Sequence, residues 1–205
     1  MPELRERLHG IERADSLAFD LHKWMYLPYD VACILVRDRD AHRSAFALSP
    51  SYLAPLERGI ASAKHAFRDF GPELSRQFRA LKVWMCLSAY GVDTFARLIA
   101  QNVAQATHLA GVVELELLAP APLNVVCFRY RPTGASAAAI DALSREILMQ
   151  LHELGIAAPS HTIIRGGFAI RVAITNHRSR LADFDALVDE VARLGGLVSS
   201  RGARL

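Results

Sequence analysis

The chain has 205 residues, of which 52% are hydrophobic and 22% charged, a composition that argues against intrinsic disorder. No run approaches the roughly 20 apolar residues that a membrane-spanning helix needs, so we expect no contact with a membrane. The formal net charge is only +3 and its excess is spread along the chain, which argues against nucleic acid as the main partner.

The first 72 residues predict two strands and a long loop. Residues 16–20 and 31–37 are predicted strands, the second a β-branched apolar run that should be well buried. The segment between them, DLHKWMYLPYD, is rich in aromatic residues and predicts a turn or loop. After a short helix over residues 41–47, the stretch SPSYLAPLERGIASAKHAFRDFGP has weak periodicity, and loops of that length are usually functional or disordered.

A helical pattern follows. Apolar residues spaced by 4, 3 and 4 positions predict one helix, which Gly91 ends; they are Leu74, Phe78, Leu81 and Met85. Asp93 is the expected N-cap of a second helix, whose apolar stripe is Phe95, Leu98, Ile99 and Val103. The basic residues Arg76, Arg79 and Lys82 line another face of the first helix, which we interpret as a solvated or interdomain face.

Residues 112–205 predict an α+β unit of antiparallel strands covered by helices on one side. The expected strands are residues 112–118, 125–130, 162–164 and 168–174, with a tight hairpin turn at Arg165-Gly166-Gly167-Phe168. Apolar periodicity predicts a helix that ends at Gly155 and a last helix that is stopped by the glycines at 195 and 196.

The first 70 residues do not look self-sufficient, because two strands and a long loop cannot enclose a core. We therefore expect that further polypeptide completes this part of the fold. The start of the chain, MPELRERLHGIERAD, is charged throughout and lacks the apolar core of a secretory signal. Cys33, Cys86 and Cys127 are far apart in apolar surroundings, which favours reduced thiols and a cytoplasmic location.

Common metal and nucleotide motifs are absent from the sequence. The eight histidines show no HxxxH or HExxH spacing, and no two cysteines are close enough to form a zinc knuckle. Glycine-rich phosphate-binding loops and dinucleotide-binding signatures are absent too. Metal catalysis is therefore not expected.

Lys23 is the strongest candidate for chemistry, in the tripeptide His22-Lys23-Trp24 between two predicted strands. Aromatic neighbours should partly desolvate its side chain, which disfavours the ammonium form and leaves a nucleophilic amine suited to Schiff-base chemistry. The alternative is that Lys23 extends from a surface loop into water and has no chemical role.

These residues carry a family resemblance. The segment IERADSLAFDLHKWMYLPYDVACILVRD resembles the lysine-bearing segment of the group II decarboxylases that depend on pyridoxal phosphate. ELSRQFRALKVWMCLSAYGVDTFARLI resembles the long helix of that family, and LNVVCFRY and GGFAIRVAITNHRS resemble strands of its C-terminal domain. The resemblance runs in order over almost the whole chain.

The resemblance implies an α/β fold of the aspartate-aminotransferase type (fold type I) and a homodimer. Residues 1–72 would be the end of the cofactor-binding large domain, with its sheet and a mobile loop. Residues 73–111 would be connecting helices, and residues 112–205 the C-terminal small domain. Lys23 would form the Schiff base with pyridoxal 5′-phosphate.

Four other residues receive roles from the resemblance. His22 would help to hold the cofactor phosphate, and Asp20 stands near that phosphate where many members carry Asn. A carboxylate would repel phosphate there unless it is turned away or hydrogen-bonded. Tyr52 matches the mobile-loop tyrosine that protonates the substrate Cα after CO2 leaves, the alternative being an exposed loop aromatic. Arg171 could meet a carboxylate, for which we expect a structural ion pair.

The implied activity is decarboxylation of an L-amino acid to the amine and CO2. In the family, the aspartate that keeps the cofactor's pyridine nitrogen protonated lies upstream of the segment where this chain begins. We therefore expect a partial family member that is poorly active alone, with an N-terminal chain as a candidate partner.

Two alternatives remain open from the sequence. One is another carbon–carbon lyase of the same fold, such as an aldolase- or cysteine-sulfinate-type relative. The other is a non-catalytic remnant that persists as a dimerisation or interaction module, with the strand edges of residues 16–37 covered by a partner.

Overall fold

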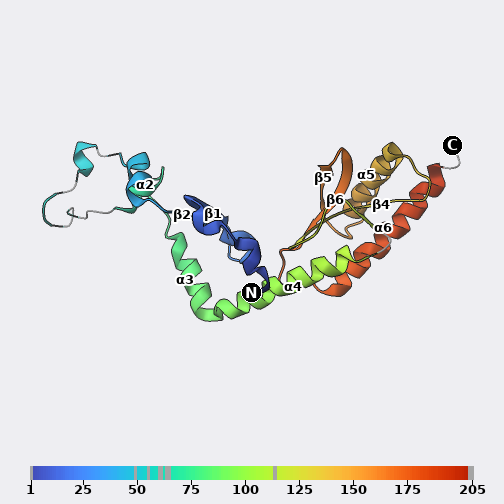
Figure 1. The fold of residues 1–205 in the computed structure, drawn as a ribbon, viewed down its shortest axis with the longest axis horizontal. Helices are drawn as coiled ribbons and strands as arrows, with labels where there is room; N and C mark the ends of the chain where they lie inside the picture. The colour runs from blue at the N-terminus through green and yellow to red at the C-terminus, as the bar shows by residue number, and fades with distance from the viewer. Residues whose placement is uncertain are drawn as a thin grey trace. The chain divides into compact units, whose positions relative to one another are not determined.

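The computed structural model divides the chain into two compact units, Met1–Gly91 (unit 1) and Val92–Leu205 (unit 2). Figure 1 labels their helices and strands. The structure describes residues 2–48, 50–54, 56–59, 62, 66–112 and 115–202.

Unit 1 is made of short elements joined by loops. In chain order they are η1 (Pro2–Leu8), η2 (Ile11–Arg13), β1 (Ser16–Asp20), α1 (Leu21–Trp24), β2 (Ala32–Val36), α2 (Arg39–Phe46), η3 (Ser51–Leu53), η5 (Phe67–Phe70) and α3 (Arg79–Tyr90). Strands β1 and β2 pair antiparallel, with Phe19 opposite Cys33 and Asp20 opposite Ala32. The two strands form a sheet of their own.

The core of unit 1 is small. Three buried side chains form it, Leu21, Leu27 and Val31, and partly buried residues of β2 and α3 pack against them. Strand β2 was expected to be well buried, but Ile34 and Leu35 are 56% and 55% exposed. The prediction of burial is therefore wrong for these two residues, because among the described residues β2 has only one neighbouring strand, β1.

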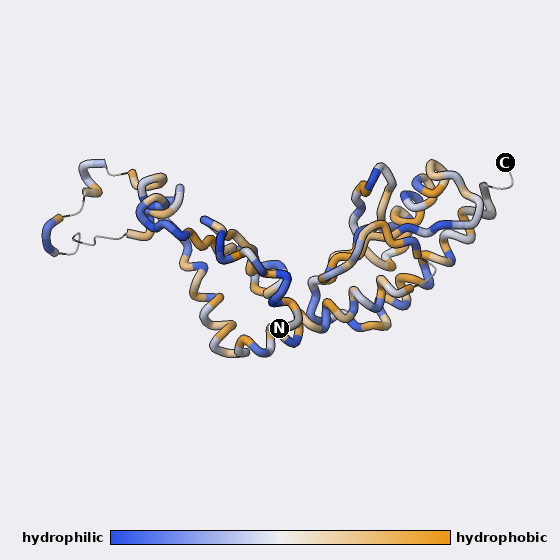
Figure 2. The backbone as a smooth tube through the Cα atoms, in the orientation of Figure 1, coloured by the Kyte–Doolittle hydropathy of each residue, from blue (hydrophilic) through white to orange (hydrophobic). Residues whose placement is uncertain are grey.

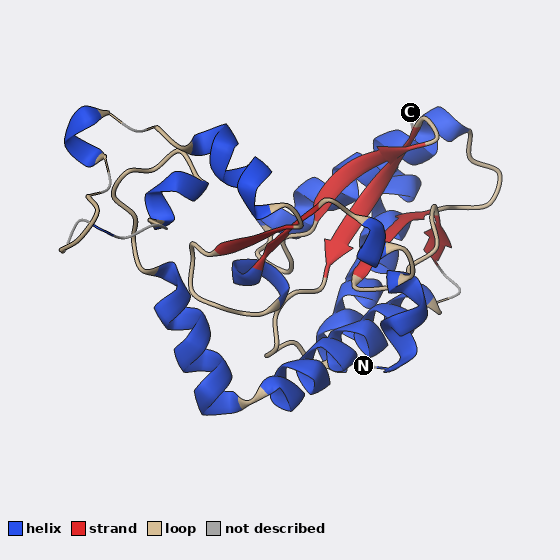
Figure 3. Ribbon diagram, turned by 60° about the vertical axis from the view of Figure 1, so that its left-hand side comes forward, coloured by secondary structure: helices blue, strands red, loops and turns tan. Residues whose placement is uncertain are grey.

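Unit 2 is larger and regular. Its elements are α4 (Val92–Ala110), β3 (Leu115–Leu117), β4 (Val125–Tyr130), α5 (Ala137–Glu153), β5 (Ser160–Ile164), β6 (Gly167–Ala173) and α6 (Leu181–Gly202). The four strands form an antiparallel sheet in the order β3-β4-β6-β5. Figure 3 shows these strands in red against the blue helices of the same unit. The predicted α+β unit is confirmed.

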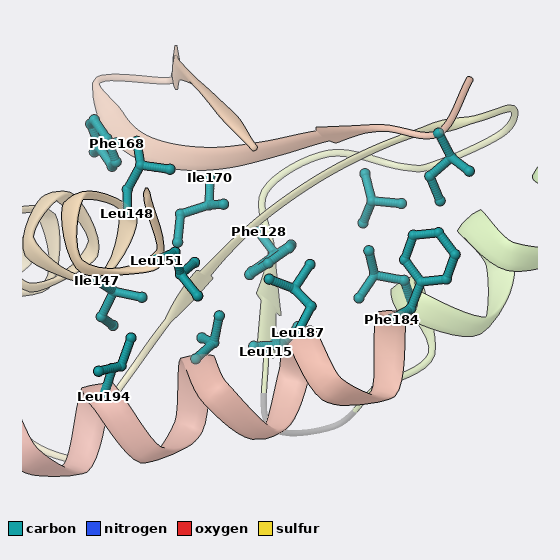
Figure 4. Close-up of a cluster of buried hydrophobic side chains, with 14 of the residues drawn as sticks. Leu115, Phe128, Ile147, Leu148, Leu151, Phe168, Ile170, Phe184, Leu187 and Leu194 are labelled. Atoms are coloured by element: carbon teal, nitrogen blue, oxygen red, sulfur yellow. The ribbon is translucent and has the colours of Figure 1, made fainter. Parts of the chain in front are cut away.

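One face of the sheet carries the core of unit 2. Phe128 and Ile170 lie opposite one another on β4 and β6 and are fully buried. Figure 4 shows them pointing toward apolar residues of α5 and α6, among them Leu151 and Leu187. This cluster gives unit 2 the enclosed core that unit 1 lacks.

The β5–β6 turn is the tight hairpin that the sequence predicts. Its two central residues, Arg165 and Gly166, have φ angles of 50° and 82°. Positive φ at both central positions is the geometry of a type I′ turn, in which glycine is favoured because it has no Cβ.

The helix boundaries differ from the prediction in several places. Helix α4 begins at Val92, so Asp93 lies in its first turn and is not the N-cap that the sequence predicts. Helix α3 begins at Arg79, so Leu74 and Phe78 precede it, and it ends at Gly91 as predicted. Helix α6 was expected to stop at Gly195 but continues to Gly202. A Cβ at Gly195 would lie 2.5 Å from the ring of Tyr130, so this glycine permits close contact between helix and strand.

Candidate active site

Lys23 lies on α1, a four-residue helix that follows β1 directly. The backbone amides of Leu21 and His22 donate to the carbonyl oxygen of Val31 at 3.0 and 3.2 Å, and the amide of Leu27 donates to the Leu21 carbonyl at 3.3 Å. Leu21 and Val31 are also buried together in the small core. The lysine-bearing segment is therefore fixed at both of its ends, where β1 ends and where β2 begins.

The amine of Lys23 forms an ion pair with the carboxylate of Asp20, one turn before it. The hydrogen bond from Lys23 lowers the pKa of Asp20, and the same hydrogen bond raises the pKa of Lys23. The Lys23 side chain is 66% exposed. The expected desolvated, neutral amine is therefore not what the structure shows, because no described layer covers α1 and a carboxylate stabilises the ammonium form.

His22 is held by the loop that returns to β2. Its Nδ1 lies 2.7 Å from the carbonyl oxygen and 3.1 Å from the amide nitrogen of Val31, so either tautomer can make a hydrogen bond there. Its ring also contacts the ring of Tyr29, with centroids 4.3 Å apart. Among the described residues, Nε2 has no hydrogen-bond partner, which leaves it as the ring nitrogen that can contact a ligand.

Two cations of α3 hold the same loop. Lys82 Nζ donates to the carbonyl oxygens of Pro28 and Asp30 at 3.2 and 2.9 Å. Arg79 Nε donates to the Asp30 carboxylate at 3.3 Å, and this hydrogen bond lowers the pKa of Asp30. The basic face expected to be solvated or interdomain thus includes two residues that support the segment after Lys23. Only the i, i+3 spacing of Arg79 and Lys82 in the sequence could have pointed to this role.

Tyr52 is not connected to the lysine segment by the hydrogen bonds or ring contacts of the described residues. It belongs to η3 and is 78% exposed. Within the described part of the chain no hydrogen bond or ring contact joins it to Lys23, His22 or Asp20. The structure thus brings three of the four predicted site residues together and leaves Tyr52 separate.

The end of the long loop is anchored to α2. Asp69 is buried, and its carboxylate lies 3.2 Å from Arg43 Nε and 3.7 Å from Arg68 Nε. The Phe70 ring contacts His42 at a centroid distance of 5.4 Å. Parts of the predicted mobile loop lie outside the described residues, namely 49, 55, 60, 61 and 63–65. Sequence reasoning missed the anchor because Asp69 has no motif that marks it as buried.

Arg171, which was expected to form a structural ion pair, contacts a hydroxyl instead. Its Nη1 donates to Ser160 Oγ at 3.3 Å, across the β5–β6 pair. No carboxylate lies within 4.0 Å of it among the described residues. The expectation of an ion pair is wrong within that part of the chain.

The donor set suits a carbonyl compound that carries an anionic group. An exposed primary amine can reach an aldehyde, and the neighbouring imidazole can donate to an anion. Asp20, which would repel an anion if it were free, is hydrogen-bonded to Lys23. These residues fit pyridoxal phosphate in part, since they offer a primary amine for its aldehyde and an imidazole nitrogen that could contact its phosphate.

Two classes of site find no support in the described residues. No cluster of three or more His, Cys, Asp or Glu side chains there could hold a metal ion. No helix in the described part of the chain is long and apolar enough to cross a membrane.

Known proteins are similar to this chain in both sequence and fold. The family model for the pyridoxal-dependent decarboxylase conserved domain matches residues 1–131. Aromatic-L-amino-acid decarboxylase of Bacillus atrophaeus is 32% identical over 94% of this chain and 41% of its own length. Tyrosine decarboxylase 4 of Petroselinum crispum is 34% identical over 92% of this chain and 41% of its own length.

Solved structures agree with the sequence comparison. The crystal structure of Oryza sativa TDC with PLP and tryptamine matches 96% of this chain and 42% of its own, with a TM-score of 0.87 and 28% identity. Tryptophan decarboxylase of Catharanthus roseus in complex with L-tryptophan matches with a TM-score of 0.80 and 26% identity, over 40% of its own length. The fold is therefore the α/β fold of the pyridoxal-phosphate-dependent decarboxylases, fold type I. The chain belongs to the pyridoxal-dependent decarboxylase family, and it spans about two fifths of the length of these relatives.

Proposed function

We propose that this chain supplies the Schiff-base lysine of a decarboxylase that converts an L-amino acid to the amine and CO2. The observation that carries the proposal is the exposed amine of Lys23, in a segment fixed between β1 and β2 and inside the region that the family model matches. The resemblance assigns the same residue to the same role. Several relatives are named as tyrosine or tryptophan decarboxylases, so aromatic L-amino acids are the first substrates to test.

Three residues of unit 1 would hold the cofactor. Pyridoxal phosphate, when bound, supplies an electron sink for the carbon that loses CO2. Lys23 would bond to its aldehyde carbon, and His22 Nε2 would donate to its phosphate. Asp20 would lie near the phosphate with its charge balanced by Lys23 before the lysine reacts.

Lys23 must lose a proton before it can act as a nucleophile, and Asp20 opposes that loss. A lysine amine of ordinary pKa is already protonated at neutral pH, and the hydrogen bond to Asp20 raises the pKa of Lys23 further, so another group must accept the proton before the amine can react. The contacts of Lys82 and Arg79 with this loop would hold His22 and the lysine segment in place while the proton leaves Lys23. Asp20 thus opposes the loss of the proton that makes the amine reactive.

Tyr52 is proposed as the residue that returns a proton to the substrate Cα. Its exposed position on the long loop leaves the hydroxyl accessible to a substrate. Removal of a general acid costs about 10²- to 10⁴-fold in rate, so Tyr52→Phe should lower amine formation by at least the smaller factor. An unchanged rate in Tyr52→Phe would show that Tyr52 is not the proton donor.

The chain would act as one part of a larger cytoplasmic assembly, with a homodimer as the expected form. It spans about two fifths of its relatives, and none of its aspartates matches the family motif for the partner of the pyridine nitrogen. We therefore expect weak cofactor binding and little decarboxylation by the 205-residue chain alone. Robust amine production by the purified chain would contradict this.

Reduction with borohydride tests the role of Lys23. The chain has only three lysines, Lys23, Lys64 and Lys82, so a peptide map can separate them. After incubation with pyridoxal phosphate and reduction, we expect the pyridoxyl group on the Lys23 peptide, with Lys82 protected by its two carbonyl contacts. Equal labelling of all three lysines, or unchanged labelling in Lys23→Ala, would overturn the assignment.

Two other functions compete with this proposal. A different carbon–carbon lyase reaction on the same fold would give the same labelling and would differ in its product. A non-catalytic interaction module is favoured by one observation, the exposed apolar residues of unit 1. Association without any Lys23-dependent labelling would support that module.

A further inference from the structure

We infer that Asp69 is a positioning residue for Tyr52 and acts through Arg68. The buried carboxylate holds the Arg68 guanidinium, and that guanidinium holds the backbone of η3, the segment that carries Tyr52. The inference rests on the proposed function for the role of Tyr52 as the proton donor. It adds the two residues that set where Tyr52 lies.

Asp69 is the only charged side chain that is buried among the described residues. Its Oδ2 accepts a hydrogen bond from Arg43 Nε at 3.2 Å, and its Oδ1 lies 3.7 Å from Arg68 Nε. A buried carboxylate is stable only when cations or hydrogen-bond donors surround it. The two oxygens of Asp69 thus orient two guanidiniums, and removal of the charge should release both.

Arg43 connects this carboxylate to α2, and the residue after Asp69 adds ring contacts. The Phe70 ring lies 5.4 Å from the His42 ring, and the guanidinium carbon of Arg39 lies 5.6 Å from the centroid of the Phe70 ring. Figure 2 shows hydrophilic residues over much of α2, and none of the residues of this helix is buried. Because α2 offers no apolar core, the ion pair and the ring contacts must hold η5 against it.

Arg68 extends these contacts to the segment of Tyr52. Its Nη2 donates to the carbonyl oxygen of Leu53 at 2.9 Å, and Leu53 follows Tyr52 directly. Within the described part of the chain, this is the one hydrogen bond that joins η3 to another element. The other hydrogen bonds of η3 are backbone contacts within residues 50–54. A single turn cannot fix its own place, so the contact with Arg68 fixes it.

The position of the Tyr52 hydroxyl depends on this backbone contact. The side chain is 78% exposed, and no ring of a described residue packs against it. A general acid must lie within hydrogen-bond reach of the atom that it protonates, and a displacement of about 1 Å can cost about 100-fold in rate. Loss of the Asp69 charge should therefore slow the step that Tyr52 performs.

Hydrogen exchange followed by mass spectrometry tests the contact in the 205-residue chain, without cofactor or substrate. Asp69→Asn removes the charge and keeps the shape of the side chain. We expect the peptide that contains Leu53 to exchange about fivefold faster or more, whereas peptides of β1 and β4 keep their rates. If Asp69→Asn unfolds unit 1, seen as faster exchange in β1, Arg68→Gln decides, because it keeps the buried carboxylate and removes the contact with Leu53. Unchanged exchange of the Leu53 peptide in both variants would overturn the inference.

Asp40→Asn is the matched control. Asp40 is exposed on α2, the helix that carries Arg43, and no ion pair joins it to another described residue. The same change of Asp to Asn there should leave the exchange of the Leu53 peptide as it is. An equal increase in Asp40→Asn and Asp69→Asn would contradict the inference, because any loss of negative charge near α2 would then explain it.

A double-mutant cycle separates positioning from a purely structural role. The chain is co-produced with the part of the Bacillus atrophaeus decarboxylase that has no counterpart in it, and CO2 release from L-tryptophan is measured with pyridoxal phosphate. If Asp69 acts through Tyr52, Asp69→Asn should lower kcat about tenfold or more, but less than about twofold in the Tyr52→Phe background. Equal losses in the two backgrounds would refute the positioning role.

The inference and the proposed function can fail separately. An assembly that releases no CO2 would count against the proposed function, and the exchange of the Leu53 peptide would still decide whether Asp69 and Arg68 hold η3. CO2 release that does not depend on Tyr52 would refute the positioning role even if Asp69→Asn speeds the exchange, since the contact would then serve no proton transfer.

Discussion

At Lys23 a neighbouring carboxylate adds to the stability of the ammonium form. The hydrogen bond from Lys23 to Asp20 raises the lysine pKa, and most of the side chain is in water. A nucleophilic lysine usually gains reactivity from burial or from a neighbouring cation, and neither is present here among the described residues. The residue is therefore positioned for chemistry and is still held in its unreactive form.

Replacement of Asp20 tests this balance. Asp20→Asn removes the charge that raises the Lys23 pKa, so more neutral amine is present at pH 7.5 and imine formation should become faster. Pyridoxal, which lacks the phosphate, reports on the amine alone when trapped with borohydride. If the rate with pyridoxal phosphate increases further than the rate with pyridoxal, Asp20 also repels the phosphate.

Asp15→Asn is the control for that experiment. Asp15 is fully exposed and its contact with Arg37 is long, at 3.8 Å. It should leave the labelling of Lys23 unchanged. A slower reaction in Asp20→Asn would show that the carboxylate assists the lysine instead of restraining it.

The candidate lysine and its neighbours in sequence could be predicted, but the contacts and exposure of their side chains could not. His22, Lys23 and Asp20 are close in sequence, so their proximity follows from a short helix after a strand. The cations Arg79 and Lys82 come from some 50 residues away, and such contacts depend on tertiary packing. The exposure of Lys23 could not be predicted from the sequence, since it depends on which other elements pack over α1.

At the scale of elements, Gly195 shows why a glycine in a helix need not end it. Gly195→Ala would place a Cβ against the Tyr130 ring at 2.5 Å, and overpacking of this kind costs about 1–3 kcal/mol. Gly196 has no atom within 4 Å of such a Cβ, so Gly196→Ala should stabilise the helix by about 0.5–1 kcal/mol. Urea unfolding followed by circular dichroism measures both, and equal effects of the two variants would contradict this packing.

A cross-strand pair makes unit 2 sensitive to acid. Glu116 lies opposite Arg129 on β3 and β4, with Nε 2.8 Å and Nη2 3.3 Å from its two carboxylate oxygens. The hydrogen bond from Arg129 lowers the pKa of Glu116 below its ordinary value of 4.5. A carboxylate with a lowered pKa in the folded state adds stability above its unfolded pKa and loses it as the pH falls through the folded pKa.

Glu116→Gln should therefore lower the free energy of unfolding at pH 7, by about 1 kcal/mol or less for a partly exposed pair. The difference from the unchanged chain should shrink as the pH falls from 5 to 3, because the wild-type carboxylate becomes protonated. Urea unfolding at several pH values measures it. A difference that stays constant or grows toward low pH would contradict the assignment.

The elements themselves were largely predictable where apolar periodicity is strong. Strands β1 and β4 have the expected bounds, and α5 is followed by Gly155 with a φ of 66° as expected. The start of α3 was predicted too early because apolar spacing continues through residues 74–78, which do not form a helix. The burial of β2 was predicted wrongly because an apolar run in the sequence shows that a strand prefers cover and does not show that cover is present.

At the scale of the whole molecule, the two units differ in completeness. Among the residues that the structure describes, sixteen are buried in the core of unit 2 and three in the core of unit 1. The unit that carries Lys23 has the smaller core, and it also has exposed apolar residues on β2 and an apolar groove. The sequence already indicated this imbalance, because two strands and a long loop cannot enclose a core.

The most direct test is the release of CO2 from L-tryptophan or L-tyrosine by the chain co-produced with the uncovered part of the Bacillus atrophaeus decarboxylase, in the presence of pyridoxal phosphate. We predict release that is lost in Lys23→Ala and far weaker when the 205-residue chain is assayed alone. An assembled complex that releases no CO2 from either amino acid, or that releases it equally with and without Lys23, would contradict the central claim.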